Sequence, residues 1–440
     1  MDDRLLKMRQ RNISIIGVKV WRILLNSGFL VVNTLGGSLF GYIFWVIASR
    51  LYSPSELGIG AAYISAIAIL ANLGDMGLGI TYIRFAPTMR TKGDKFLNSI
   101  IFVVISSTLS FTLLFSVLIP VFKPEFSLSN NASWSAVILI GIAISFSTAQ
   151  LLDKFFIAFE SNQYSFIRIL IANLIRIGIL IILSPSNGAI NLIIAVGFGA
   201  FVTTLAVIKF YIPKFIPGYR FGISIDLTLI WDKARYSLSN YFSQFLWSAP
   251  ALLYPIIILI IMGTEANAHF YINWMIANVL FIIPYAISTS VFANASNPGG
   301  VSDQLYRRIL FFTLVGLIPL VILFGLLSNY LQGIFGNVYI NESQLLYLLL
   351  LSVFPYSFNT FVLVKFRILQ YNRGVVLLSL VIASLSLIFT SIFSIRFGLD
   401  GAGIGWLIGQ SIGVIISILV YRNLWLSMAK PETSKIVIAQ

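Results

Sequence analysis

The chain has 440 residues, of which 58% are hydrophobic and only 10% are charged. So few charges cannot cover a soluble globule of this length, and the composition therefore indicates a polytopic membrane protein. A net charge of +14 would suggest nucleic acid as the partner of a soluble protein. Here the basic residues fall in the loops between apolar segments, so we expect no nucleic-acid partner. The chain has no cysteine, which excludes disulfides and thiol catalysis.

Twelve apolar runs follow one another along the chain, each of a length suited to crossing a bilayer as a helix. They lie near residues 24–49, 57–83, 96–120, 134–159, 166–184, 188–211, 237–262, 268–292, 306–331, 344–369, 375–396 and 401–424. The sequence therefore predicts an all-α membrane protein with about twelve transmembrane helices.

The 29 Lys and Arg residues are distributed unevenly over the two sides of these helices. Loops on one side, together with both termini, carry 25 of them, whereas the other side carries Arg50, Lys123 and Arg396. By the positive-inside rule, this asymmetry predicts a multi-pass protein of the cytoplasmic (inner) membrane with both termini in the cytoplasm. Arg176 alone is left within the membrane.

The two halves of the chain repeat one plan about 210 residues apart. Gly188 follows Asn187 at the start of the sixth helix, and Gly401 follows Asp400 at the start of the twelfth. A parallel repeat of this kind predicts two pseudo-symmetric six-helix bundles. We expect an N-terminal lobe at 1–211, a cytoplasmic linker at 212–236, a C-terminal lobe at 237–424 and a cytoplasmic tail at 425–440.

Four stretches resemble a known family. They read A-S-R-L-Y-S-P-S-E-L-G at 48–58, L-G-D-M-G-L-G at 73–79 with Arg84 following, N-Q-Y-S-F-I-R at 162–168, and F-G-L-D-G-A-G-I-G-W at 397–406. The pattern resembles the oligosaccharide flippases that export O-antigen or capsular polysaccharide repeat units, within the multidrug/oligosaccharidyl-lipid/polysaccharide exporter superfamily. The resemblance extends over essentially the whole chain.

This resemblance implies a V-shaped pair of six-helix bundles that moves a polyprenyl-pyrophosphate-linked glycan from the inner to the outer leaflet by alternating access. It further implies coupling to an H⁺ or Na⁺ gradient, contact with membrane lipids, and the polysaccharide polymerase machinery as a partner.

Several other chemistries find no support in the sequence. No G-x-x-x-x-G-K-[ST] phosphate loop is present, and one histidine without cysteine does not favour a metal site, so we expect no cofactor. A membrane enzyme acting on lipid-linked sugars would need charged residues in a sizeable external loop, and the outward loops are short. A cation-coupled multidrug or small-molecule antiporter of the same superfamily remains an alternative. Such an antiporter would lack an anion-binding arginine.

Arg176 lies about 12 residues inside the fifth predicted helix, or near 18 Å deep at a rise of 1.5 Å per residue. A guanidinium at that depth needs an anion, water or carbonyl groups. Either it binds the pyrophosphate, which its fork matches bidentately, or it pairs with an acidic residue on a neighbouring helix. Arg168, nearer the entrance of the same helix, either attracts the head group or reaches to the interface as a structural residue.

Asp75 lies within apolar sequence, where an ionised carboxylate costs about 3 kcal/mol. It shares one helical face with Ser65, Asn72 and Tyr82, and such a face can line water. Asp75 therefore either binds the coupling ion or pairs with a basic residue at the inner helix end.

The seventh predicted helix carries a polar and aromatic stripe that includes Asn240, Gln244 and Trp247. Such side chains suit sugar hydroxyls and sugar faces, but they also form hydrogen bonds between helices. The candidate substrate-binding residues are Arg176, Arg168, Asn26, Asn33, Asn240, Gln244, Trp247, Trp274 and Asn278. The row Gly405, Gly409 and Gly413 is expected to serve close helix packing.

Overall fold

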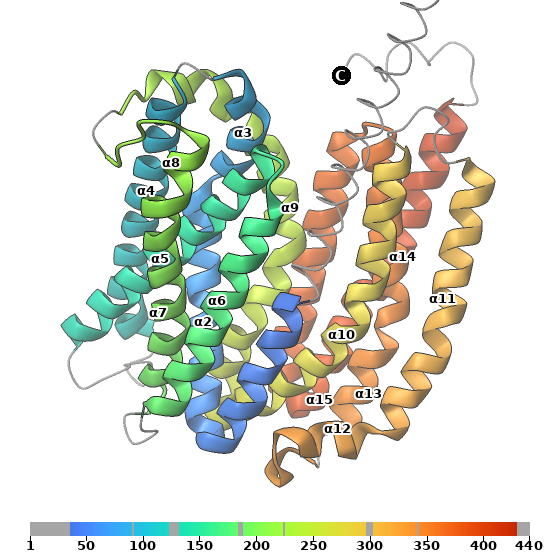
Figure 1. Cartoon of the computed structure of the whole chain (residues 1–440). Helices are drawn as coiled ribbons and strands as arrows, with labels where there is room; N and C mark the ends of the chain where they lie inside the picture. Colours follow the sequence, from blue (N-terminus) through green and yellow to red (C-terminus); the bar gives the residue numbers. More distant parts are fainter. Residues whose placement is uncertain are drawn as a thin grey trace, which may run out of the picture. The chain divides into compact units, whose positions relative to one another are not determined.

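The computed structural model describes residues 36–89, 92–122, 132–183, 188–222, 225–295, 302–340 and 343–428, which are helical with no strand among them (Figure 1). Ten helical segments of these ranges are long and apolar enough to cross a membrane. One of them, 372–420, contains two helices joined at Gly398, and a further helix is described over 36–51. The predicted all-α fold with about twelve transmembrane helices is confirmed.

The helices of the first half are α2 (Pro54–Asp75), α3 (Leu78–Phe85), α4 (Gly93–Phe122), α5 (Ala132–Ala158), α6 (Asn162–Ile182), α7 (Ile190–Ala206) and α8 (Ile212–Phe215). Those of the second half are α9 (Thr228–Met262), α10 (Thr264–Ala295), α11 (Asp303–Leu326), α12 (Ser328–Phe335), α13 (Ser343–Leu351), α14 (Val353–Ile368) and α15 (Asn372–Met428). The helix α9 begins at Thr228 rather than at the expected 237, so part of the expected linker is helical.

A capping box starts α2. The backbone N–H of Ser53 donates to Oε2 of Glu56 at 2.9 Å, and the backbone N–H of Glu56 donates to Oγ of Ser53 at 3.3 Å. Two backbone donors at the helix start are thereby satisfied, and Pro54 between them needs no donor at the first helical position. This local chemistry explains why the S-P-S-E sequence begins a helix.

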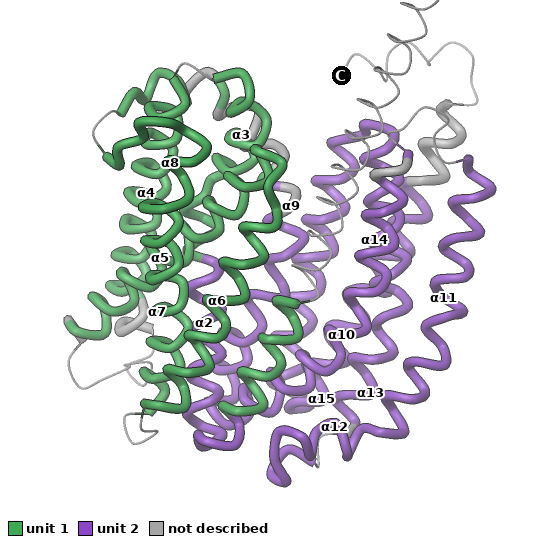
Figure 2. The backbone as a smooth tube through the Cα atoms, viewed as in Figure 1, with its two compact units in different colours: residues 1–48, 70–241 green, residues 49–69, 242–440 purple. Residues whose placement is uncertain are grey.

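The chain divides into two compact units, which Figure 2 colours separately. Unit 1 contains the residues up to 48 together with 70–241, and unit 2 contains 49–69 together with 242–440. Within unit 2, the amide of Asn267 donates to the Gly58 carbonyl at 2.7 Å. A Cβ atom at Gly58 would lie 1.8 Å from the carbonyl oxygen of Thr264, so only glycine permits this approach of α2 to α10.

Close packing also joins the two halves of α15. The chain reverses at Gly398, whose φ of 64° favours glycine. A Cβ atom would lie 2.4 Å from Thr390 Cα if built at Gly405, and 2.5 Å from Ser386 Cα if built at Gly409. The predicted packing role of this glycine row is confirmed.

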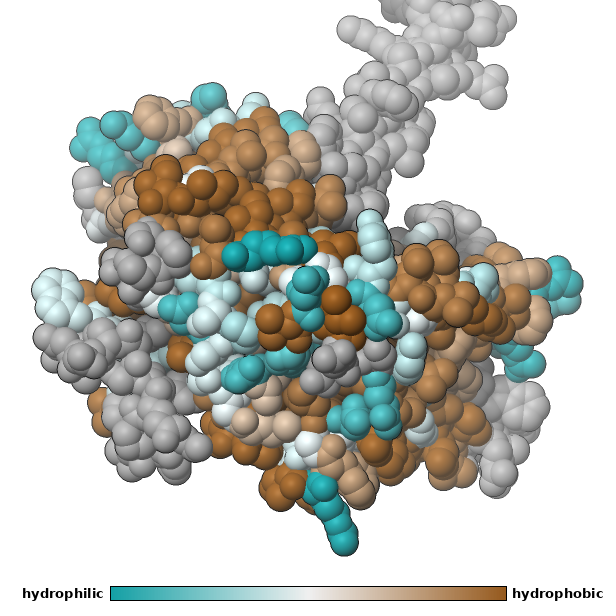
Figure 3. Space-filling view, turned by 90° about the horizontal axis from the view of Figure 1, so that it is seen from below, coloured by the Kyte–Doolittle hydropathy of each residue, from teal (hydrophilic) through white to brown (hydrophobic). Residues whose placement is uncertain are grey.

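Apolar side chains cover much of the outer surface, as contact with lipid requires. Figure 3 shows hydrophobic residues over a large part of the face seen from below. Along α11, only 11% of the membrane span is buried within the protein, and Phe311, Phe312 and Leu326 are among its exposed residues. Such a helix would be unfavourable in water but is stable against hydrocarbon.

Candidate functional site

A tight turn separates α2 from α3 in unit 1. Met76 and Gly77 have φ angles of 46° and 79°, which end the helix and leave the last carbonyls of α2 without intrahelical partners. Side chains satisfy them: the hydroxyl of Ser107 donates to the Gly74 carbonyl at 2.6 Å, and the hydroxyl of Tyr241 donates to the Asn72 carbonyl. The L-G-D-M-G-L-G sequence therefore encodes a precise break in a membrane helix.

Asp75 ends α2 at this turn and is 2% exposed. Its Oδ2 lies 2.9 Å from Nζ of Lys154 on α5, and its Oδ1 accepts the backbone N–H of Gly79 at 3.2 Å. A Cβ atom at Gly79 would lie 2.1 Å from Cδ of Lys154, so the glycine makes room for the lysine stem. The structure thus places Asp75 in a pair with a basic residue, one of its two expected roles. Ion coupling at Asp75 stays a prediction.

The preceding residue on α5, Asp153, holds Arg168 of α6. The guanidinium Nε donates to Oδ1 of Asp153 at 2.8 Å, Nη2 donates to Oδ2, and the hydroxyl of Ser165 donates to Oδ1 at 2.7 Å. Arg168 is only 9% exposed. Its fork is engaged by a carboxylate of its own unit, which favours a structural role over attraction of a head group.

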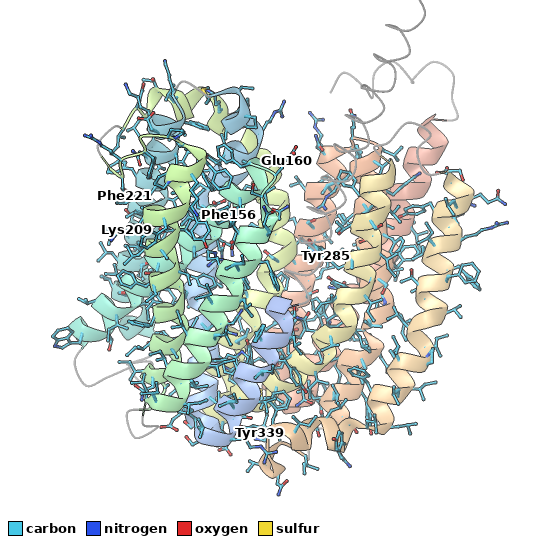
Figure 4. All side chains as sticks on the ribbon, in the orientation of Figure 1. Phe156, Glu160, Lys209, Phe221, Tyr285 and Tyr339 are labelled. Atoms are coloured by element: carbon cyan, nitrogen blue, oxygen red, sulfur yellow. The ribbon has the colours of Figure 1, made fainter. Side chains whose placement is uncertain are left out.

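Asp75, Lys154, Asp153 and Arg168 together form a neutral group of four charges, here named the charge quartet. Neighbouring residues on a helix point about 100° apart, so Asp153 and Lys154 reach two different partners. The quartet lies near the end of α5 that Phe156 and Glu160 mark in Figure 4. It ties α2, α5 and α6 together at one level of unit 1.

Arg176 lies fourteen residues beyond the start of α6 at Asn162, or about 21 Å along the helix axis. Its guanidinium carbon lies 4.6 Å from the centroid of the Phe44 ring. This is a cation–π contact, in which the ring attracts the guanidinium. Arg176 thus lies inside the membrane span, about two turns before α6 ends at Ile182. Its binding of an anion stays a prediction.

Unit 2 contains a cavity of about 140 Å³ between α9, α10 and α14. Trp247, predicted to bind substrate, lines it from α9, and Tyr285, labelled in Figure 4, lines it from α10. The full lining consists of Trp247, Tyr285, Ser288, Thr289, Phe292, Thr360, Leu363, Val364 and Arg367. This set is named the aromatic cavity below.

The aromatic cavity combines flat rings, hydroxyls and one cation. The hydroxyls of Ser288 and Thr289 donate to the Tyr285 carbonyl at 2.9 and 2.8 Å, so their oxygen lone pairs remain as acceptors. Trp247 stacks on Tyr356 with ring centroids 5.4 Å apart, which fixes its orientation. Rings, hydroxyl acceptors and a guanidinium are the groups that bind a sugar attached to a phosphate.

Sequence inspection missed most of this lining. The residues Tyr285, Ser288, Thr289 and Phe292 recur at helical spacing along α10 and would have revealed one face. Arg367 lies near the end of α14, within the helix that the sequence predicts at 344–369, but the charge count treats it only as one of the 25 cations of one side. A hydroxyl face next to an aromatic is a weak signal, because the same residues also pack helices.

The remaining predicted residues divide into three groups. Trp274 is 7% exposed and packs between Tyr254 and Trp406, at ring centroid distances of 5.3 and 5.1 Å, so helix packing is its observed role. Asn278 is exposed on α10. The other four lie outside the described residues, Asn26 and Asn33 entirely and Asn240 and Gln244 in their side chains. Among the described residues, no group of three His, Cys, Asp or Glu side chains could hold a metal ion.

Comparison with solved structures identifies the fold. A multidrug resistance MATE family transporter of the MOP superfamily in an inward-facing conformation matches with a TM-score of 0.67, at 15% identity over 90% of this chain and 96% of that chain. The lipid II flippase MurJ in an inward closed conformation matches with a TM-score of 0.66, at 16% identity over 89% of this chain and 87% of that chain. A MOP superfamily transporter from Pyrococcus furiosus matches with a TM-score of 0.53, at 15% identity over 93% of this chain and 95% of that chain.

At these identities the similarity shows a shared fold. No curated protein matches the chain. The family model described as "Polysaccharide biosynthesis protein" matches residues 23–298, which is more than half of the chain. The chain therefore belongs to the polysaccharide biosynthesis protein family and has the fold of the MOP superfamily.

Proposed function

We propose that the protein is a flippase for a polyprenyl-pyrophosphate-linked oligosaccharide, an O-antigen or capsule repeat unit, which it moves from the inner to the outer leaflet of the cytoplasmic membrane. The family match to polysaccharide biosynthesis supports a glycan, and a fold shared with a lipid II flippase supports transport of a lipid-linked one. The observation that carries the proposal is Arg176, a cation inside a membrane span, about two turns before α6 ends at Ile182.

An arginine inside a membrane span is costly to insert. The insertion cost of an arginine at a helix centre is about 3 kcal/mol on the lenient scales. The guanidinium carbon lies 4.6 Å from the centroid of the Phe44 ring, a cation–π contact that restricts its orientation. A pyrophosphate presents paired oxygen atoms that match the fork of the guanidinium. We therefore assign Arg176 to the pyrophosphate.

The aromatic cavity of unit 2 is assigned to the glycan. Trp247 supplies a flat apolar surface for a sugar ring, and the exposed hydroxyl of Thr289 accepts a hydrogen bond from a sugar hydroxyl. Arg367 supplies a cation for acidic sugars or for a phosphate. Transport would follow alternating access, in which binding favours one of two conformations and release the other.

An H⁺ or Na⁺ gradient would drive this cycle. The Asp75–Lys154 pair is the candidate coupling group, because a cation that binds the carboxylate competes with the ammonium of Lys154. Both termini would face the cytoplasm, as the loop charges predict.

The test is transport in proteoliposomes. A fluorescent polyprenyl-pyrophosphate oligosaccharide should become accessible in the opposite leaflet with the native protein, and a neutral polyprenyl glycoside should not. Arg176→Ala should slow this transport about 100-fold, because it removes two charge-assisted hydrogen bonds. Arg373→Gln, at an exposed arginine of α15, is the matched control and should transport normally.

The alternative function gives a distinct result. A cation-coupled antiporter would export an organic cation such as ethidium against a gradient, with the glycan lipid left in place. Equal transport by native protein and Arg176→Ala, in well-folded samples, would remove the pyrophosphate assignment. Net hydrolysis or transfer of the sugar would indicate an enzyme instead.

A further inference from the structure

The first turns of α11 in unit 2 form a basic and aromatic groove on the lipid-facing side of that helix. A cavity of about 570 Å³ is lined there by Asp303, Gln304, Arg307, Arg308, Phe311 and Phe312. Positions 304, 308, 311 and 312 share one helical face, on which Arg308 is followed by two exposed rings, and Arg307 lies beside that face. We name this set the α11 groove.

A second cavity, of about 220 Å³, adjoins the α11 groove and shares Asp303 and Arg307 with it. Its apolar lining consists of Leu310 of α11, Phe358 and Val362 of α14, and Ile418 of α15. The two cavities together therefore offer both cations and apolar side chains, the groups that a phospholipid contacts.

Lys365 neutralises Asp303, which is the one acidic residue lining the α11 groove. Its Nζ pairs with Oδ1 of Asp303, and it lies 5.3 Å from the centroid of the Tyr306 ring. The hydroxyl of Tyr306 in turn donates to the Phe361 carbonyl at 2.5 Å, which fixes the ring. With Asp303 balanced in this way, Arg307 and Arg308 give the groove a net positive charge.

The position along the helix fits a lipid head group. Ser302 caps α11, its Oγ accepting the backbone N–H of Leu305 at 3.2 Å, so the positive end of the helix dipole points to the same level as the two arginines. Phe311 and Phe312, 61% and 67% exposed, lie one turn deeper. The order of the two arginines and then the two rings along α11 matches the order of the phosphate and the acyl chains in a phospholipid.

We propose that the α11 groove binds an anionic phospholipid, with its phosphate at Arg307 and Arg308 and one acyl chain along Phe311 into the apolar cavity. Arginine suits this role because its planar fork binds phosphate bidentately. The site lies within unit 2 and is separate from Arg176 and from the aromatic cavity. It is a site for a bulk membrane lipid and does not depend on the proposed transport function.

The experiment is native mass spectrometry and thermal unfolding of the full chain, delipidated and then titrated with phosphatidylglycerol or phosphatidylcholine. We expect phosphatidylglycerol to bind and to raise Tm more than phosphatidylcholine does. The double variant Arg307→Gln, Arg308→Gln should bind phosphatidylglycerol about 30-fold more weakly, since each basic side chain near an anionic lipid contributes about fivefold and the two factors multiply. Arg373→Gln, an exposed arginine at the start of α15, is the matched control and should bind normally.

Two further arms test the lipid itself. Inorganic phosphate at equal ionic strength should give no rise in Tm, and Leu310→Trp, which fills the apolar cavity while leaving the arginines, should weaken phosphatidylglycerol binding at least threefold. Equal binding of the two phospholipids, equal loss in Arg373→Gln, or a full rise in Tm with inorganic phosphate alone would each overturn the proposal. If Leu310→Trp fails to fold, Leu310→Phe serves in its place.

Discussion

Nζ of Lys154 lies 2.9 Å from Oδ2 of Asp75, and this ion pair joins α5 to the last residue of α2. The carboxylate is 3% exposed and the ammonium side chain 27%, so one partner is buried and the other reaches toward solvent. Breaking an ion pair of this kind is destabilising, because removal of one partner leaves the other as an uncompensated charge. The pair therefore fixes the position of the α2 end against α5. The break between α2 and α3 therefore depends on α5.

Asp75→Asn should lower the stability of unit 1, because Lys154 then faces a neutral amide. We expect a loss of about 2 kcal/mol in the free energy of unfolding, somewhat below the range for fully buried pairs. The measurement is thermal unfolding in detergent. Asp75→Asn combined with Lys154→Met should recover most of the loss, whereas additive losses in the double variant would show that the pair is not the cause.

The same variants test ion coupling. If Asp75 binds the coupling ion, Asp75→Asn should abolish transport that depends on a gradient and leave glycan binding nearly unchanged. The stability-restored double variant should also fail to respond to the gradient. Gradient-driven transport by that double variant would assign Asp75 a structural role only.

Arg168 gives a second prediction through its pair with Asp153. Arg168→Gln leaves the Asp153 carboxylate with only the Ser165 hydroxyl of its described partners, so we expect lower Tm and lower transport. Asp153→Asn in the same chain removes the orphaned charge and should restore Tm. If transport returns as well, Arg168 is structural, as its geometry favours. Transport that stays low at restored Tm would instead assign it to the substrate.

The fold was accessible from sequence because hydropathy reports what the bilayer requires. Backbone groups in hydrocarbon must be bonded within the segment, so each apolar run of sufficient length becomes a helix. Boundaries were less accessible: α9 begins at Thr228, in a stretch where charges such as Lys233 mask the helical pattern. The assignment of 49–69 to unit 2 depends on Gly58 contacts with α10, which no local pattern encodes.

The site was predictable only where a single residue is chemically exceptional. Arg176 and Asp75 were found because a charge in apolar sequence is costly wherever it lies. Their partners were not named, since Phe44 and Lys154 lie far from them in sequence. Trp274 was predicted as a sugar platform but is packed among rings, because aromatic residues at helical spacing serve both purposes.

A third prediction concerns the segment after α8. The Tyr219 hydroxyl donates to Oδ1 of Asn98 at 2.7 Å, and burial, with the nearby charge of Asp94, raises the pKa of Tyr219 above its ordinary value of 10.0. The unfolded phenol ionises near pH 10 while the folded one stays neutral, so its contribution to stability is complete below pH 10 and falls as pH rises above it.

The fall in Tm between pH 9 and pH 11 should therefore be smaller in Tyr219→Phe than in the native chain, by an amount that corresponds to about 1 kcal/mol at pH 11. Other tyrosines also titrate there, which is why the comparison is between the two proteins. Tyr330→Phe, at an exposed tyrosine, is the control and should change nothing. Equal slopes for all three proteins would contradict the prediction.

The fourth prediction tests the packing inside α15. Gly405→Ala would place a Cβ atom 2.4 Å from the Thr390 backbone, and the two helix halves would have to separate. Overpacking of this kind costs about 3 kcal/mol, so we expect a large fall in Tm. Gly316→Ala on α11 meets no atom within 4 Å and should be neutral or slightly stabilising. Similar Tm values for the two variants would show that the helices separate at little cost.

The last prediction separates charge from shape at Arg176. Arg176→Lys keeps the positive charge but loses the planar fork and its stacking on Phe44, so transport should fall about tenfold, less than with alanine. Phe44→Leu keeps the arginine but removes the ring below it, and we expect a smaller loss of two- to fivefold through poorer orientation of the guanidinium. Both variants are measured in the proteoliposome assay beside their Tm values.

A structural ion pair would give a different pattern of losses. Lysine would then keep transport near the native rate, and alanine would act mainly through a lower Tm. The affinity for inorganic pyrophosphate, measured by its inhibition of glycan-lipid transport, adds a readout that a structural role would not move. It should weaken in the order native, Phe44→Leu, Arg176→Lys, Arg176→Ala, and an unchanged inhibition constant across the four proteins would remove Arg176 from the binding site.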